Sequence, residues 1–114
     1  MGHPASTSAS PLTVHRARGL WSRLGGLLAH PELRKGEALY LAPCAAVHTF
    51  FMVYSIDVVF LDASGRVIKV VDDLAPWRTA KCRGARAVLE LRGGQASRYG
   101  IAPGTLLDPT FIEG

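Results

Sequence analysis

The segment from residue 47 to residue 71 constrains the fold of this chain more than any other. It holds two runs rich in β-branched and aromatic residues, Ile56–Leu61 and Arg66–Val71, separated by the short polar sequence Asp-Ala-Ser-Gly. Runs of this kind favour strands, and a polar turn with glycine at its end between two of them is typical of a β-hairpin. The sequence therefore predicts an antiparallel hairpin around which the rest of the chain is organised.

Glycine and proline divide the remaining chain into short segments. Strands are predicted where apolar residues alternate or cluster, and helices where apolar residues recur at helical spacing. The predicted strands are 12–17, 38–42, 47–52, 85–91 and one or two within 106–112, and the predicted helical segments are 20–28 and 95–99. Residues 72–76 are predicted to form a loop, residues 77–84 an irregular crossing, and Glu90 a solvent-facing position in its strand.

These elements predict a mainly β (α+β) fold. About seven short strands with one or two short helices are typical of a single compact β-sandwich or barrel-like domain. A length of 114 residues with 48% hydrophobic and 19% charged residues favours one packed globular domain over disorder. Residues 1–11, rich in Ser, Ala and Pro, are predicted to be a disordered tail, and residues 12–114 the single domain.

Localisation and partners follow from apolar runs and charge. No stretch approaches the roughly 18 to 20 apolar residues of a membrane helix, and the first residues lack the apolar core of a signal peptide. We therefore expect a cytoplasmic protein for the chain as written, and an envelope-associated or exported one if a leader has been removed. The net charge is +4, but charge runs are more often solvated faces, so nucleic acid is not the expected partner.

Several ordered segments resemble the uncharacterised DUF192 family, also called UPF0127. The resemblance runs from about residue 13 to residue 107 and is carried by Arg18-Gly19-Leu20, Ala38–Leu41, Phe50-Phe51-Met52, Ile56-Asp57, Phe60-Leu61-Asp62, Val88–Leu91 with Gly93-Gly94, and Pro103-Gly104. It implies a β-dominated, sandwich-like fold, a family in which many members carry an export signal, and no established activity.

The chain also departs from the family pattern. Phe51 stands where many members have Trp, and Thr105 replaces the Asp that follows Gly104. The link from Met52 to Asp57 is shorter than the usual one containing Lys-Asn-Thr. A polar ligand network built on that Lys-Asn-Thr is therefore not carried over.

Polar residues interrupt the apolar strands near the hairpin. A buried Asp57 must be paired or protonated, because an isolated buried carboxylate is too costly, and an Arg such as Arg78 is the natural partner. The alternative is a carboxylate that anchors a ligand in a pocket lined by aromatic residues and Met52. The candidate ligand-binding residues are His48, Thr49, Met52, Asp57, Trp77 and Arg78.

Cys44, His48 and Cys82 are the alternative centre of chemistry. They are metal-ligand types, but the spacing lacks a CxxC pair, and His15, His30 or water would have to supply a fourth ligand. A Cys–His nucleophilic pair is a further hypothesis, although no oxyanion motif accompanies it. The simpler interpretation is two reduced, buried thiols and a hydrogen-bonded strand histidine, since two cysteines are too few for a disulfide framework.

The sequence thus predicts a small module that binds an unknown small molecule or protein, without catalytic activity and without a cofactor. The alternatives are a metal- or thiol-dependent protein using Cys44, His48 and Cys82, and a protein that binds anionic polymers through its Arg-rich segments. Because no complete catalytic motif is present, the sequence leaves enzymatic activity open.

Overall fold

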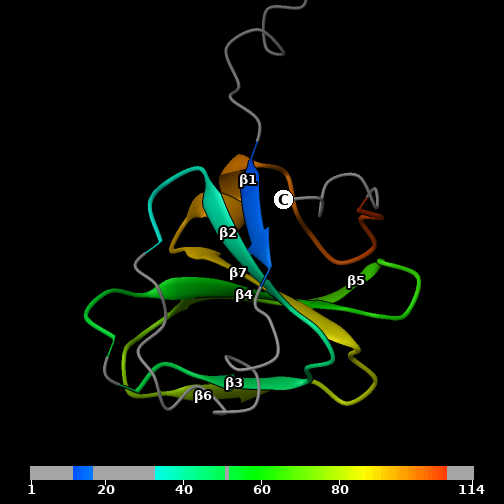
Figure 1. The fold of residues 1–114 in the computed structure, drawn as a ribbon, viewed down its shortest axis with the longest axis horizontal. Coiled ribbons are helices and arrows are strands. Elements are labelled where there is room, and N and C mark those ends of the chain that lie inside the picture. Colours follow the sequence, from blue (N-terminus) through cyan, green and yellow to red (C-terminus); the bar gives the residue numbers. More distant parts are fainter. Residues whose placement is uncertain (1–11, 17–32, 51, 108–114) are drawn as a thin grey trace, which may run out of the picture.

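The computed structural model describes residues 12–16, 33–50 and 52–107, and these ranges hold seven strands and one helix. The elements are β1 (Thr13–Arg16), β2 (Glu37–Leu41), β3 (Ala46–His48), β4 (Ile56–Leu61), β5 (Val67–Leu74), β6 (Thr79–Lys81), β7 (Ala87–Arg92) and α3 (Gln95–Arg98). A five-stranded sheet has the order β1-β2-β7-β4-β5, and β3 pairs with β6 in a separate two-stranded sheet (Figure 1). The predicted mainly β, sandwich-like fold with about seven strands is confirmed.

The central hairpin forms as predicted, from β4 and β5. Its turn is held by the Asp62 carboxylate, whose Oδ1 accepts hydrogen bonds from the Ser64 amide at 2.8 Å, the Ser64 hydroxyl at 2.7 Å and the Arg66 amide at 3.0 Å. These donors hold the pKa of Asp62 below its ordinary value. Gly65 has a φ of 89°, a left-handed conformation that glycine adopts without steric cost.

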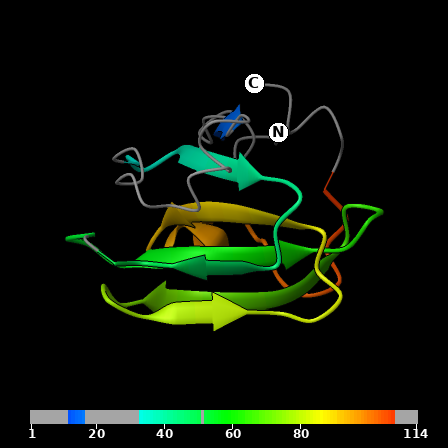
Figure 2. The same cartoon turned by 60° about the horizontal axis from the view of Figure 1, so that its bottom comes forward.

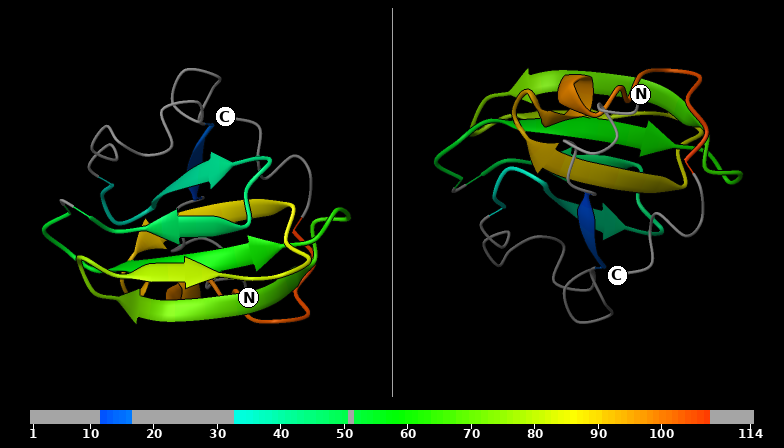
Figure 3. Two further views of the ribbon diagram at one scale, coloured as in Figure 1. Left: turned by 90° about the horizontal axis from the view of Figure 1, so that it is seen from below. Right: turned by 90° about the horizontal axis from the view of Figure 1, so that it is seen from above.

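The two sheets pack as layers, with the β3–β6 sheet on one face of the five-stranded sheet and α3 on the other (Figures 2 and 3). Every residue of β4 is buried, because its two faces serve two cores. The inter-sheet cluster comprises Leu33, Leu39, Leu41, Val47, Met52, Ile56, Val58, Phe60, Ala85 and Val88. The helix-side cluster comprises Val14, Ala38, Val59, Leu61, Val67, Ala87, Leu89, Leu91, Ala96, Ile101 and Leu107.

Most predicted elements are observed within a residue or two of their expected bounds. The hairpin, the strands around 12–17, 38–42 and 85–91, and the turn of helix at 95–99 are confirmed. The predicted tail (1–11), the predicted helix (20–28) and residues 111–112 lie outside the described residues. No helix in the described ranges is long and apolar enough to cross a membrane.

Three local predictions were wrong. The strand expected at 47–52 is shorter and consists of Ala46–His48, and the loop expected at 72–76 instead begins with the last residues of β5. The irregular crossing contains β6, whose three residues are too few to show a period. Of the one or two strands expected within 106–112, the described residues 106–107 show an isolated bridge between Arg66 and Leu106.

The prediction that Glu90 faces solvent was wrong, because this residue is fully buried. Its strand, β7, lies in the middle of the five-stranded sheet, between β2 and β4. The cross-strand neighbours of Glu90 are Leu39 and Val58, both in the inter-sheet cluster. Alternation of polar and apolar residues predicts exposure only for a strand with one solvated face, and β7 has none.

Candidate functional site

Asp57 is fully buried, on the helix-side face of β4. Its Oδ1 accepts hydrogen bonds from the amides of Asp73 at 2.9 Å and Gly94 at 3.1 Å, and its Oδ2 accepts one from the amide of Ala96 at 2.8 Å. Three backbone donors satisfy the carboxylate, so the predicted ion pair with an arginine was wrong. Sequence spacing does not reveal these donors, because they come from the distant end of β5 and the start of α3.

Thr49 is also fully buried, and it holds the turn formed by residues 75–78. Its hydroxyl donates to the Ala75 carbonyl at 2.7 Å and accepts from the Arg78 amide at 2.8 Å. Its backbone amide donates to the Arg78 carbonyl at 2.9 Å, and its carbonyl accepts from the Trp77 amide at 3.0 Å. One residue therefore fixes both sides of the turn that carries Trp77.

Trp77 is presented to solvent from this turn in an unfavourable backbone conformation. Its φ is 65°, in the left-handed region that bulky residues avoid, and its side chain is 54% exposed. The Phe50 ring lies between Trp77 and His48, at centroid distances of 5.6 Å and 4.6 Å and with nearly parallel planes. We call these three residues the aromatic row.

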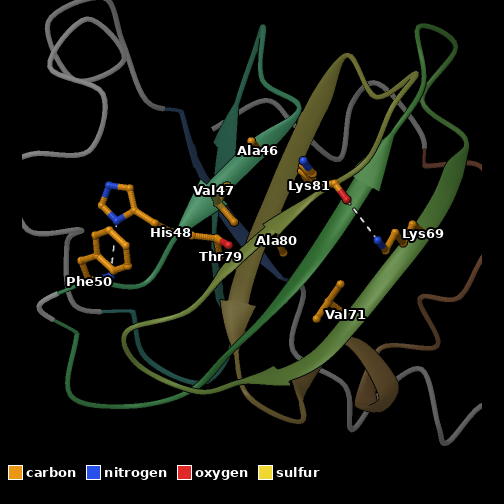
Figure 4. Close-up of a pocket in the computed structure, with 9 residues that line it drawn as sticks. All are labelled: Ala46, Val47, His48, Phe50, Lys69, Val71, Thr79, Ala80 and Lys81. Carbon is orange, nitrogen blue, oxygen red and sulfur yellow. Dashed lines mark hydrogen bonds between the residues drawn. The ribbon is translucent and has the colours of Figure 1, made fainter.

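Two members of the aromatic row, His48 and Phe50, line one end of a groove of about 580 Å³ (Figure 4). Lys69 and Val71 reach the groove from β5, and the remaining lining residues come from β3, β6 and the residue after Thr49. The Lys69 ammonium donates a hydrogen bond to the Lys81 carbonyl at 3.0 Å across the groove. The lining residues are Ala46, Val47, His48, Phe50, Lys69, Val71, Thr79, Ala80 and Lys81.

The structure places the predicted site residues in different parts of the fold. His48 and Trp77 come together in the aromatic row, and the Thr49 hydroxyl holds the turn that carries Trp77. Arg78 is exposed, and its Nη1 donates to the Trp77 carbonyl at 3.3 Å.

Of the six predicted ligand-binding residues, His48 lines the groove and the other five do not. Met52 is buried in the inter-sheet cluster, and Asp57 lies on the opposite face of the five-stranded sheet. Sequence reasoning missed Lys69 and Lys81 as lining residues. The two lysines lie on strands of different sheets, so only the packing of the two sheets against each other brings them together.

The two cysteines are free thiols, each partly buried. The Cys44 thiol donates to the Ala46 carbonyl at 3.2 Å, and the Cys82 thiol to the Arg83 carbonyl at 3.6 Å. Burial raises the pKa of the Cys44 thiol, and the negative charge of Glu90 adds to the increase. Within the described ranges, no group of three His, Cys, Asp or Glu side chains is placed to hold a metal ion, so Cys44, His48 and Cys82 are not brought together as a ligand set.

Comparisons with known proteins place the chain among uncharacterised relatives. The DUF192 family model, described as "Uncharacterized ACR, COG1430", matches residues 3–109. A UPF0127 protein from Pyrococcus horikoshii is 42% identical over 59 residues, which are 52% of this chain and 50% of the relative. The match therefore spans about half of the relative's length.

Two solved structures are similar to this one. A protein of unknown function from Novosphingobium aromaticivorans has a TM-score of 0.67 and 28% identity, over 80% of this chain and 70% of that one. A putative transcription regulator from Sinorhizobium meliloti has a TM-score of 0.71 and 19% identity, over 86% of this chain and 81% of that one. At this low identity the second similarity concerns the fold alone.

Proposed function

The chain belongs to the DUF192 family of uncharacterised proteins, and we propose that it is a non-catalytic binding module whose site is the groove between β3, β5 and β6. The observation that carries the proposal is the aromatic row at the end of a groove lined by two lysines. Large exposed apolar groups beside a concave surface are typical of binding sites. The partner that fits is a negatively charged molecule with an apolar or planar part.

The backbone around Trp77 supports a role for its exposed ring. A left-handed conformation at a bulky residue costs on the order of 1–3 kcal/mol and persists only where the surrounding structure holds it. Here the buried hydroxyl and backbone of Thr49 hold it. Such strain is concentrated at functional sites, and here it accompanies an indole side chain that is 54% exposed.

The groove favours binding over chemistry. Its nine lining residues include no carboxylate and no thiol, and the Lys69 ammonium is hydrogen-bonded to the Lys81 carbonyl. Thiol nucleophiles and carboxylate acids or bases are therefore missing among these residues. Two ammonium groups beside apolar side chains are suited to orient an anion by charge and hold it by contact area.

A heteronuclear NMR titration of the isotope-labelled chain tests this proposal. Three probes separate charge from ring: indoleacetate carries an anion and an aromatic ring, tryptamine a cation and the same ring, and acetate the anion alone. We expect saturable shifts with indoleacetate, confined to residues 46–50, 69–71 and 77–81, and weaker effects with the other two. Equal binding of tryptamine, or indoleacetate shifts spread over the whole chain, would contradict the proposal.

A matched pair of substitutions assigns the effect to the aromatic row. Trp77→Ala removes the end of the row and is expected to weaken indoleacetate binding by about tenfold, since buried aromatic contacts are the main anchors in such sites. Leu106→Ala removes an apolar side chain that is 57% exposed elsewhere, beside Arg66. It is expected to leave the affinity unchanged.

A further inference from the structure

The outer edge of β6 has backbone groups that point away from its partner strand. Hydrogen bonds from the Thr49 amide to the Arg78 carbonyl and from the Cys82 amide to the Ala45 carbonyl flank the β3–β6 ladder. In an antiparallel pair, hydrogen-bonded and non-hydrogen-bonded positions alternate. Ala80 therefore faces β3, whereas the amides and carbonyls of Thr79 and Lys81 point outward.

This outward edge opens into the groove. The Lys81 carbonyl accepts its hydrogen bond from Lys69, which reaches across from β5 (Figure 4). Within the described ranges, the structure shows no partner for the other three outward groups, the Lys81 amide and the amide and carbonyl of Thr79. Within those ranges β6 pairs with β3 alone, so the two-stranded sheet is open to a third strand on this side.

We propose that the partner of the groove is an acidic peptide in extended conformation, which pairs with the outer edge of β6 and extends the β3–β6 sheet to three strands. This inference rests on the function proposed above. Neighbouring strands lie about 4.8 Å apart, so an added strand would cover the side chains of Lys69 and Val71 on the floor of the groove. The three residues of β6 provide a pairing length of about 10 Å.

Charge selects the peptide. Lys69 and Lys81 are exposed lining residues, and Arg78 and Arg83 are exposed just before and just after β6. Acidic side chains on an added strand would meet these cations, while an apolar side chain at its end would contact the aromatic row. Addition of a peptide strand to an open sheet edge is a recurring mode of recognition, in which backbone hydrogen bonds supply affinity and side-chain contacts supply specificity.

Lysine near an open edge also has a protective role, since proteins use it to prevent edge-to-edge aggregation. The two roles predict opposite effects of charge on peptide binding. If Lys69 only protects the edge, its replacement should make the edge more accessible to any peptide. If it also recognises acidic side chains, a reversed charge should exclude acidic peptides and admit basic ones.

The test is amide hydrogen exchange of the full chain with and without a capped hexapeptide of alternating Glu and Val. With the peptide at about ten times its Kd, exchange of the Thr79 and Lys81 amides is expected to slow by about tenfold, because only the free fraction exchanges. The Ala80 amide already faces β3 and serves as the internal control, with little change expected. Two control peptides, one with Lys in place of Glu and one N-methylated at its four central amides, are expected not to protect these amides.

Matched variants test the charge. Lys69→Glu is expected to weaken binding of the acidic peptide by about tenfold and to strengthen binding of the basic one. Lys35→Glu makes the same change of net charge in the exposed turn before β2 and is expected to leave both affinities unchanged. Thr79→Pro removes one outward amide without removing a donor to β3, and the folded variant is expected to lose protection at Lys81.

The outcomes separate this inference from the function proposed above. Indoleacetate binding without alternating protection by the acidic peptide would overturn the strand addition and leave the binding site in place. Equal affinity for the N-methylated peptide would do the same. If neither indoleacetate nor the peptide binds, both proposals fail.

Discussion

The five-stranded sheet is covered in different ways on its two faces. On the helix side, α3 and residues 101–107 pack against the sheet, and the buried Asp57 carboxylate is satisfied by backbone amides of the same chain. On the other side, two three-residue strands cover part of the surface and leave a groove with lysines and an aromatic row. A buried polar residue therefore does not by itself mark a binding site. Asp57 stabilises a closed face, whereas Thr49 holds the turn from which the Trp77 side chain is exposed.

The sharpest test of the closed face is Asp57→Asn. An Asn side chain keeps one acceptor oxygen but sets its own NH₂ group against a backbone donor, so we expect a loss of about 2–3 kcal/mol in the free energy of unfolding. This loss is measured by urea denaturation, with unfolding monitored by circular dichroism. Asp72→Asn, at an exposed position of β5, should change the free energy by less than about 0.5 kcal/mol. Equal losses in the two variants would remove the distinction between a buried anchor and a surface carboxylate.

Thr49→Val tests whether the buried hydroxyl serves the open face. The substitution keeps the shape of the side chain but removes its contacts with Ala75 and Arg78, with an expected loss of about 1–2 kcal/mol in unfolding free energy. Because the turn that carries Trp77 loosens, binding of indoleacetate should weaken as well. Thr49→Ser keeps the hydroxyl and should keep the affinity, even if the lost methyl group costs some stability. Weaker binding of indoleacetate by the Thr49→Ser variant than by the Thr49→Val variant would contradict the role assigned to the hydroxyl.

Trp77→Gly and Trp77→Ala together measure the backbone cost of presenting the ring. Both remove the indole, but glycine adopts a φ of 65° without the steric cost, so the Gly variant should be more stable than the Ala variant by about 1 kcal/mol. The same pair at Val53, an exposed position without positive φ, should show the opposite order. Thermal or urea unfolding of the four variants measures these differences in stability. If Trp77→Ala is as stable as Trp77→Gly, no backbone strain is stored at residue 77.

Cys44 packs against the inter-sheet cluster and tests how well this part of the core excludes water, and the expected effect is the smallest. Burial raises the pKa of this thiol, so at pH 8 its thiolate fraction lies below that of an ordinary cysteine. Its alkylation by iodoacetamide should therefore be slower than that of a cysteine in an unstructured peptide and should still increase with pH where the peptide's rate has levelled off. Stability from the buried neutral thiol is present below the unfolded pKa and is lost as pH rises through the folded one. Alkylation at the peptide's rate would indicate that water reaches this part of the core.

Local pattern was sufficient to predict the hairpin, the strand Ala87–Arg92 within two residues, and the helical turn after Gly94, because each is encoded by neighbouring residues. The errors arose where contacts with distant segments determine the burial or the hydrogen bonds of a residue. Glu90 is buried because strands pack on both sides of its own, and Asp57 is satisfied by amides far along the chain.

The candidate site was predicted in part. His48 and Trp77 were named from the polar and aromatic residues near the hairpin, and the structure brings them together with Phe50. Lys69 and Lys81 were missed because they meet only when β5 lies beside β6. Spacing along the chain carries no information on that contact.

The hydrogen bonds of Asp57 also determine how cooperatively the molecule unfolds. They join one position on β4 to residues 16, 37 and 39 places further along the chain. Helix α3 has four residues, far fewer than an isolated helix needs to persist in water, so it exists only while these distant segments remain assembled. Its Ala96 amide should therefore exchange with solvent deuterium only through global opening, which makes this short helix a reporter of the stability of the whole domain.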